Sequence, residues 1–299
     1  MIRILGTIFA GLFGLAFGSF LNVCLSRWPE GESIVHPRSH CRNCTHTLSW
    51  WENIPIISWL ALRGRCRNCQ TWIGLRYPLV ELAVGGLWAY TFWCAAFQLA
   101  RPGFSFASQD AILAYIELDL AVGMMVFYWL LIGLAVLDAE HLWLPNLITL
   151  PGIALGIIFY CAKIGQLQWF LLVNPWPWIL KALGGRLLAV VLAAALILLI
   201  RWLYKLIRHR EGIGLGDAKL MALLAAWLGL PGALLSFALG VILGALAALV
   251  LLALTKPKAQ SESWSLTKLP LGTFLCIGGI VSSLWGQPII AAYLHWSGF

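Results

Sequence analysis

The sequence predicts an all-α integral membrane protein with about eight transmembrane helices and a small cytoplasmic zinc domain between the first two. Of the 299 residues, 61% are hydrophobic and 11% are charged, whereas soluble domains carry about 25% charged residues. Several apolar runs approach the roughly 20 residues that a helix needs to cross hydrocarbon with its backbone groups paired. Two closely spaced pairs of cysteines stand in the long polar segment 26–77.

The apolar runs are expected to be membrane spans. The first, from Ile4 to Leu25, is too long for the apolar part of a signal peptide and lacks a small-residue cleavage site, so we expect a retained helix. Pro231-Gly232 marks a tight turn between the sixth and seventh runs, and Pro102-Gly103 and Pro175-Trp176-Pro177 break the chain in the same way. The expected spans are 4–25, 78–100, 111–137, 145–162, 179–203, 217–230, 232–254 and 271–295.

The distribution of Lys and Arg predicts the orientation. Fifteen of the 20 lie in loops on one side, which the positive-inside rule places in the cytoplasm, with both termini outside. The net charge of +8 therefore reflects membrane topology, and we expect lipid and no nucleic acid as a partner. The cytoplasmic loops are 26–77, 138–144, 201–219 and 255–270. The expected domains are a first transmembrane helix (1–25), a cytoplasmic zinc-binding domain (26–77) and a multi-helix transmembrane core (78–299).

Two identical CRNC tetrads lie in the segment 26–77, with 21 residues between Cys44 and Cys66. Two-residue spacing lets both thiolates of a knuckle reach one tetrahedral ion, and two knuckles complete a four-sulfur zinc site. Four sulfur ligands leave no open position for water, so we expect a structural zinc. The neighbouring arginines should favour the thiolate form. The expected ligands are Cys41, Cys44, Cys66 and Cys69.

Other assignments of these residues stay open. Two disulfides are the alternative to zinc, but a reducing cytoplasm and the paired spacing disfavour them. Three nearby histidines are alternative ligands: His36, His40 and His46. The remaining cysteines stand singly in apolar runs and are expected to be packing residues: Cys24, Cys94, Cys161 and Cys276.

Acids beside the apolar runs are candidates for catalysis, because an acid within a membrane is costly. Asp138 closes the third run and Asp217 opens the sixth, so both should face the cytoplasm. Two carboxylates brought close cannot both ionise cheaply, so one holds a proton while the other activates water, as in an aspartyl protease. Gly214 and Gly216 would allow close backbone approach of a substrate strand, and Lys219 would bind lipid headgroups or the pair itself.

Three alternatives concern these aspartates. They could be helix caps or loop residues at the membrane interface. A transporter would use intramembrane acids to bind substrate or protons, but its acids should lie near span centres rather than at their ends. A catalytically silent scaffold around the zinc module is the third, and the intact acid motifs disfavour it.

Further motifs extend along most of the chain: Phe17-Gly18-Ser19-Phe20-Leu21-Asn22-Val23, Pro37-Arg38-Ser39-His40, Trp51-Glu52-Asn53-Ile54-Pro55 and Arg76-Tyr77-Pro78-Leu79-Val80-Glu81. With the cysteines and aspartates, they resemble the type IV prepilin peptidases, also called leader peptidase/N-methyltransferases, bacterial membrane aspartyl proteases. The family's D-x5-[IL]-P and GxGD patterns fall on Asp138, with Leu144-Pro145, and on Asp217. The resemblance implies that these two aspartates form the protease dyad.

The resemblance also implies a reaction and a location. The enzyme would remove the short basic leader of type IV prepilins or type II secretion pseudopilins after a glycine, at the cytoplasmic face of the bacterial inner membrane. S-adenosylmethionine would then methylate the new N-terminal residue, usually phenylalanine. The tetracysteine domain favours this bifunctional form. One departure, Pro270-Leu271-Gly272-Thr273-Phe274 in place of P-x-G-P-x, concerns the cytoplasmic entrance rather than the dyad.

Residues for the methyl donor are not identified by the sequence, which has no Rossmann-type glycine-rich turn. Methyl transfer is therefore expected from the resemblance alone. Glu81 is interpreted as a buried partner of a nearby arginine or backbone group in preference to a methyl-transfer role. Asn22 is interpreted as a polar contact between spans rather than a catalytic group.

Overall fold

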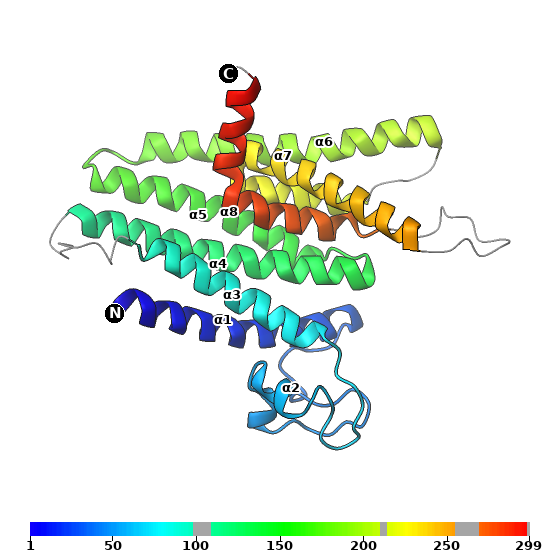
Figure 1. The fold of residues 1–299 in the computed structure, drawn as a ribbon. Helices are drawn as coiled ribbons and strands as arrows, with labels where there is room; N and C mark the ends of the chain where they lie inside the picture. Colours follow the sequence, from blue (N-terminus) through cyan, green and yellow to red (C-terminus); the bar gives the residue numbers. More distant parts are fainter. Residues whose placement is uncertain (98–108, 210–213, 255–268, 298–299) are drawn as a thin grey trace. The chain divides into compact units, whose positions relative to one another are not determined.

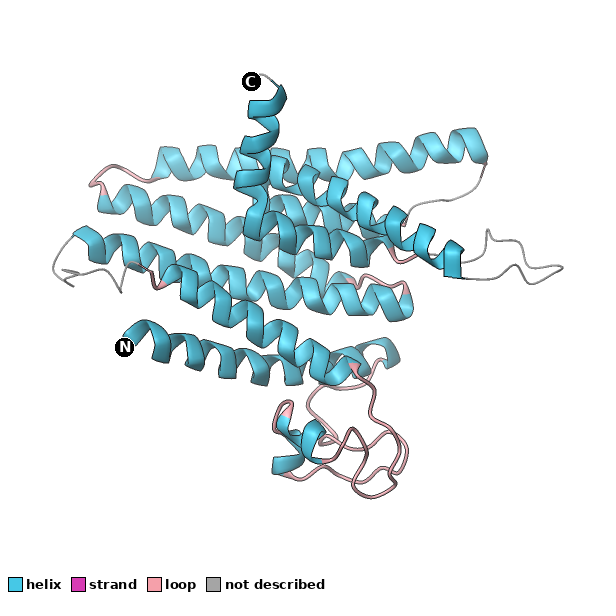
Figure 2. Cartoon of the chain, in the orientation of Figure 1, coloured by secondary structure: helices cyan, strands magenta, loops and turns pink. Residues whose placement is uncertain are grey.

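The computed structural model describes residues 1–97, 109–209, 214–254 and 269–297, with side chains of the fourth helix described from Ala114. The expected turn at Pro102-Gly103 and most of the expected loop 255–270 lie outside these residues. Helices dominate the described residues, which contain no β-strand, and the longest loops lie between α1 and α3 (Figure 2). The predicted all-α class is confirmed.

The chain divides into two compact units, Met1–Gly133 and Leu134–Phe299. The first unit contains α1 (Ile2–Arg27), the 3-10 turns η1 (Trp28–Glu30) and η2 (Trp50–Asn53), α2 (Ile57–Ala61), α3 (Arg76–Ala95) and most of α4 (Gln109–His141). The second unit contains the end of α4, α5 (Asn146–Phe170), α6 (Trp176–Arg208), α7 (Leu215–Leu254) and α8 (Leu271–Ser297) (Figure 1). The division into 1–25, 26–77 and 78–299 stays a prediction.

Six helices are long and apolar enough to cross a membrane among the described residues: α1 (with η1), α4, α5, α6, α7 and α8. The protein is therefore a multi-pass membrane protein. Eight spans were expected. The second expected span corresponds to α3, a helix of 20 residues that is not among these six helices. The sixth and seventh both fall within α7, whose 40 residues would extend for about 60 Å as one straight helix, twice the hydrocarbon thickness.

Helix α7 reverses direction at Gly229, where φ is 76° and ψ is 176°. Near its start, Gly216 packs on the Leu144 side chain, which also contacts Gly272 at the start of α8. Further along α7, Gly244 packs on Phe274, two residues beyond Gly272. A straight helix would separate residues 216 and 244 by about 42 Å, so α7 must fold back. The turn was predicted at Pro231-Gly232, and the structure places it two residues earlier, at Gly229.

The returning half of α7 packs closely against α8. A Cβ on Gly240 would lie 3.1 Å from the Leu275 backbone nitrogen, and one on Gly278 would lie 2.4 Å from the Ser236 carbonyl oxygen. Small residues allow helix backbones to approach in this way within a membrane. The antiparallel pairing brings the start of α8 to the same end of the second unit as the start of α7.

Arg186 of α6 supports the break in α7. Its guanidinium donates a hydrogen bond of 3.2 Å to the Ala225 carbonyl oxygen and lies 3.6 Å from the centre of the Tyr160 ring. Carbonyl groups in the last turn of a helix have no partner within the helix, and a cation is favourable near that end. Arg186 therefore stabilises the end of the first half of α7.

In the first unit, α1 and α3 lie side by side (Figure 1). A Cβ on Gly14 would lie 2.9 Å from Gly85 Cα, and one on Gly18 would lie 2.7 Å from Glu81 Cα. The helices are therefore antiparallel and in backbone contact, which fixes Glu81 against the C-terminal half of α1.

Candidate active site and metal centre

Asp138 lies in the last turn of α4 and is 6% exposed. Its Oδ2 accepts a hydrogen bond of 2.8 Å from the Thr273 backbone N–H and lies 3.4 Å from the Thr273 hydroxyl. That hydroxyl also donates to the Ala135 carbonyl oxygen at 2.9 Å. Thr273 therefore joins the first turn of α8 to the last turn of α4 and fixes the orientation of this carboxyl group.

Asp217 lies in the first turn of α7 and is 8% exposed. Its Oδ2 accepts a hydrogen bond of 3.2 Å from the Gly214 backbone N–H, so the capping interaction considered from the sequence is present. The carboxyl group also interacts electrostatically with Asp138, and the buried Cys276 lies within the field of both aspartates. The second unit therefore brings together two acids that are 79 positions apart in the sequence.

Leu144 and Pro145 connect the two aspartates through packing. Pro145 precedes the first residue of α5, and the buried Leu144 side chain points back between the starts of two helices. A Cβ on Gly216 or on Gly272 would lie 3.1 Å from this side chain. Glycine at both positions lets α7 and α8 approach Leu144, and so brings Asp217 and Thr273 toward Asp138.

Lys219 donates a hydrogen bond of 2.5 Å to Asn146 Oδ1. The lysine therefore links the first turn of α7 to the first turn of α5, beside the carboxyl pair. Sequence reasoning did not identify Asn146, Gly272 or Thr273 as parts of this site. The only signal was the unusual Pro270-Leu271-Gly272-Thr273-Phe274 segment, whose Gly272 and Thr273 lie directly against Asp138.

The four tetrad cysteines form one cluster in the first unit, with all four Sγ atoms within 4.8 Å of one another. The Cys41–Cys69 and Cys44–Cys66 Sγ distances are 3.8 and 3.9 Å. Tetrahedral zinc with Zn–S bonds of about 2.3 Å separates its sulfurs by roughly 3.8 Å, whereas a disulfide joins sulfurs about 2.05 Å apart. The cluster fits zinc, and no histidine of the described residues joins it.

The two knuckles repeat each other with an offset of 25 residues. Cys41 N–H donates to the His46 carbonyl and Cys66 N–H to the Thr71 carbonyl, both at 2.9 Å. The residue after the second cysteine has a left-handed backbone in each knuckle, with φ of 56° at Thr45 and 57° at Gln70. The duplicated tetrad in the sequence is therefore a duplicated structure.

The asparagine of each tetrad donates a hydrogen bond to a cysteine sulfur of the other tetrad. Asn43 of the first tetrad donates to Cys69 Sγ, and Asn68 of the second donates to Cys44 Sγ, both at 3.6 Å. The sequence predicted that the neighbouring arginines favour the thiolate form; the Arg42 guanidinium binds Glu30 and Glu32. Amide donors to the ligands are outer-shell contacts that orient a metal site.

The cysteines differ in acidity. Hydrogen bonding with Thr71, whose hydroxyl oxygen lies 3.3 Å from Cys69 Sγ, and with Asn43 lowers the pKa of the Cys69 thiol to about 5. Desolvation raises the pKa of the Cys41 thiol to about 11. Because zinc binds the thiolate form, the lowered pKa of the Cys69 thiol favours metal binding at this position.

Glu81 and Asn22 lie where α1, α3 and the tetracysteine segment meet. Glu81 Oε2 accepts a hydrogen bond of 2.7 Å from the Ile56 backbone N–H, and Ser19 and Asn22 also donate to this carboxyl group. Asn22 Nδ2 donates to the Tyr77 carbonyl oxygen at 3.0 Å. Glu81 therefore has a backbone partner, and Asn22 joins two helices.

The fold and the two sites define a multi-pass membrane protein with a buried pair of aspartates and a four-cysteine cluster that fits a metal ion. Residues 12–95 match the family described as Bacterial Peptidase A24 N-terminal domain, and residues 125–249 match the Type IV leader peptidase family. The chain belongs to the type IV prepilin leader peptidase family, and the resemblance inferred from its motifs is confirmed.

Several curated relatives match over almost their whole length, and each is named "Prepilin leader peptidase/N-methyltransferase". The protein from Stutzerimonas stutzeri is 33% identical, with 96% of this chain and 93% of the relative covered. The protein from Pseudomonas aeruginosa is 32% identical, with the same coverage. The protein from Burkholderia pseudomallei strain 1026b is 35% identical over 94% of this chain and 85% of the relative. No solved structure matches the chain.

Proposed function

We propose that this protein cleaves the leader peptide of type IV prepilins, type II secretion pseudopilins or both, and then methylates the new N-terminal residue. The shared name of its relatives supports both activities. The observation that carries the peptidase assignment is the burial of Asp138 and Asp217 in one electrostatically coupled site. Each carboxyl group is also held by a backbone N–H.

Asp138 and Asp217 are proposed as the catalytic dyad. One carboxyl group holds a proton while the other takes a proton from a water molecule, which attacks the carbonyl carbon of the glycine before the cleaved bond. The protonated partner then supplies a proton to the departing amine. Thr273 holds Asp138, and Gly214 holds Asp217, so neither side chain has to reorient before the water attacks.

Structural zinc is proposed to bind the cluster formed by Cys41, Cys44, Cys66 and Cys69.

S-adenosylmethionine is proposed as the methyl donor. The uncharged N-terminal amine forms a bond to the methyl carbon while the carbon–sulfur bond breaks, and the electron pair stays on sulfur. The positive charge thereby passes from the sulfonium to the methylated amine, so no oxidant or reductant is needed.

The location is proposed to be the bacterial inner membrane, with the tetracysteine segment and the aspartates at the cytoplasmic face and both termini in the periplasm. The loop charges support this orientation. Seven Lys and Arg residues lie in 26–77 and five in 201–219, and basic residues accumulate in cytoplasmic loops.

The peptidase proposal is tested with purified protein and a prepilin whose leader ends in Gly and whose mature chain begins with Phe. We expect Asp138→Asn and Asp217→Asn each to slow cleavage by roughly 10²- to 10⁴-fold, because each removes an acid–base group. Glu140→Gln, the same change at an exposed acid two residues from Asp138, should cleave as wild type does. Wild-type cleavage rates in either aspartate variant would exclude the dyad.

Methyl transfer is followed in the same reaction with S-adenosylmethionine labelled in its methyl group. We expect label on the cleaved pilin only after the leader is removed, since the acceptor amine does not exist before cleavage. Label that appears on an uncleaved prepilin, or no label on a fully cleaved one, would contradict the proposed second activity.

A further inference from the structure

The first unit contains a cavity of about 290 Å³ whose walls come from three parts of the chain. The end of α1 contributes Asn22, the start of α3 contributes Tyr77 and Glu81, and the tetracysteine segment contributes Glu52. This volume is near the lower end of the range for small-molecule pockets, roughly 300 to 1,000 Å³. The cavity is built entirely from residues that the peptidase mechanism does not use.

The wall of this cavity carries two buried acids. Glu52 and Glu81 are each 6% exposed. Glu81 accepts hydrogen bonds from the Ile56 N–H and from the side chains of Ser19 and Asn22. Glu52 accepts one from the Ser49 N–H at 2.7 Å, and its Oε2 lies 3.8 Å from His46 Nε2. A buried carboxylate is costly unless a donor or a cation compensates it. Glu52 Oε1 has no donor within the described chain, so this wall favours a ligand that brings N–H donors or positive charge.

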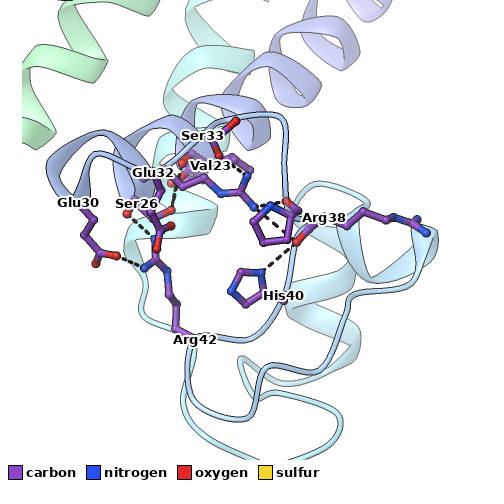
Figure 3. A network of polar contacts seen from close by, with 11 residues as sticks. Val23, Ser26, Glu30, Glu32, Ser33, Arg38, His40 and Arg42 are labelled. Carbon is purple, nitrogen blue, oxygen red and sulfur yellow. Dashed lines mark hydrogen bonds and ion pairs between the residues drawn. The ribbon is translucent and has the colours of Figure 1, made fainter.

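Three arginines line the wall, and each has a partner other than the two acids. The Arg67 guanidinium lies 5.1 Å from the centre of the Trp51 ring. Arg27 donates to the carbonyl oxygens of Ser33 and Pro37 at 2.8 and 2.7 Å. Arg42 binds Glu30 and the Ser26 carbonyl oxygen (Figure 3). Since the guanidinium groups of Arg27 and Arg42 are directed to α1 and the segment after it, they do not neutralise the two acids of the cavity.

Two buried acceptor atoms among the residues that line the cavity have no hydrogen-bond partner within the described chain. They are Glu52 Oε1 and Asn22 Oδ1. The Glu52 side chain is 1% exposed, and Asn22 as a whole is 2% exposed. A buried acceptor without a donor costs roughly 1–3 kcal/mol, so the two atoms indicate a ligand rich in N–H or O–H groups.

Aromatic rings complete the wall. Trp59 is fixed by a hydrogen bond of 3.0 Å from its Nε1 to the Ile73 carbonyl oxygen. Trp72 meets it edge to face, with ring centres 5.6 Å apart, and is 57% exposed. Indole faces stack on flat heterocycles and attract cations.

We propose that this cavity is the binding site for S-adenosylmethionine, with Glu52 and Asn22 accepting hydrogen bonds from the donor molecule. S-adenosylmethionine carries a sulfonium cation, an ammonium group, two ribose hydroxyls and a flat adenine. This matches the acids, the orphan acceptors and the aromatic wall. The inference rests on the proposed methyl transfer and adds its location. Because Cys41 and Cys66 also line the cavity, the metal centre would hold one wall in place.

The first test measures binding of labelled S-adenosylmethionine to the purified zinc-loaded protein by equilibrium dialysis. Glu52→Gln keeps an acceptor for the Ser49 N–H, because glutamine serves in a capping box as glutamate does, but it places an amide donor where Oε1 was. We expect Kd to rise by roughly 10- to 150-fold, as for losing a hydrogen bond to a charged group. Glu32→Gln, the same change at an acid that does not line the cavity, should leave Kd unchanged.

A second variant blocks the cavity. Gly74 lines it, and a Cβ there would meet nothing within 4 Å, so Gly74→Phe should add a ring without a backbone clash. We expect loss of binding and of methyl transfer, with zinc content and leader cleavage retained. Gly86→Phe, at an equally open position of α3 outside the cavity, is the matched control and should bind normally.

The outcomes separate the location from the activity. Wild-type affinity in both Glu52→Gln and Gly74→Phe, with methyl transfer intact, would refute this site while leaving the proposed function in place. Wild-type protein that cleaves prepilin but neither binds nor uses S-adenosylmethionine would refute the proposed methyl transfer itself.

Discussion

Gly272 is predicted to position Asp138, and Gly272→Ala tests this directly. A Cβ at this position would lie 2.8 Å from Asp138 Oδ2, 2.9 Å from its Cγ and 3.1 Å from Leu144 Cδ1. Ordinary contact begins at 3.4 Å, so the carboxyl group or the start of α8 must retreat by about 0.6 Å. The Thr273 N–H bond to the same oxygen, now 2.8 Å, would lengthen or bend as a result.

The expected effect is larger on catalysis than on stability. A displacement of 1 Å in a catalytic group costs about 10²-fold, so a shift of about 0.6 Å should lower kcat/KM for prepilin cleavage by roughly 10- to 100-fold. Adding one methyl group to a packed interior costs about 1–3 kcal/mol. The protein should therefore still fold and retain its zinc.

The assay compares initial cleavage rates with thermal unfolding in the same detergent. Gly286→Ala on the same helix is the control, because its Cβ would meet Ser282 Oγ at 3.3 Å and Leu235 Cδ2 at 3.6 Å, far from the aspartates. It should lose neither activity nor stability appreciably. If Gly272→Ala cleaves prepilin at the wild-type rate, Gly272 does not set the position of Asp138 and the packing argument is wrong.

Three further outcomes are expected. Cys41→Ser should remove zinc, measured by metal analysis, while circular dichroism of the helical core persists, since the cysteines serve the metal alone. Asn68→Ala should weaken zinc retention against a chelator by roughly 10- to 100-fold, as for other outer-shell contacts, whereas Gln70→Ala should not; equal retention would show that the amide is dispensable. Arg186→Leu should lower stability to heat by about 1–3 kcal/mol through loss of the bond to a helix end, and the exposed Lys181→Leu should not; an unchanged melting temperature for Arg186→Leu would contradict this role.

The four-cysteine cluster could be predicted from the sequence because the spacing that forms each cysteine pair is local. The spacing within each tetrad fixes two sulfurs on one turn, and only the approach of the two knuckles depends on the fold. The contacts of the asparagines could not be predicted, because Asn43 reaches the sulfur of the other tetrad. Adjacency to the cysteines favoured the arginines, but the long Arg42 side chain extends away to Glu30.

The carboxyl pair was less predictable from the residues alone. Asp138 and Asp217 were selected by their positions at span ends and by the family motifs, but the partner of Asp138 is Thr273, 135 positions away. No local pattern encodes that contact. The break in α7 was displaced for a physical reason: proline fits the first turn of a helix, so Pro231 can begin the returning half, while the positive φ falls to Gly229.

The reversal at Gly229 is what makes the carboxyl site possible. The start of α8 must lie at the end of the second unit where α7 begins, because Gly216 and Gly272 both pack on Leu144 and Thr273 binds Asp138. A single continuous α7 would carry the chain about 60 Å from Asp217 and leave α8 to start on the opposite side of the bilayer. Folding α7 into two antiparallel halves returns the chain, and the glycines between its second half and α8 keep the pair in contact. The geometry of the carboxyl pair therefore depends on a helix break 12 residues from Asp217 as directly as on the aspartates themselves.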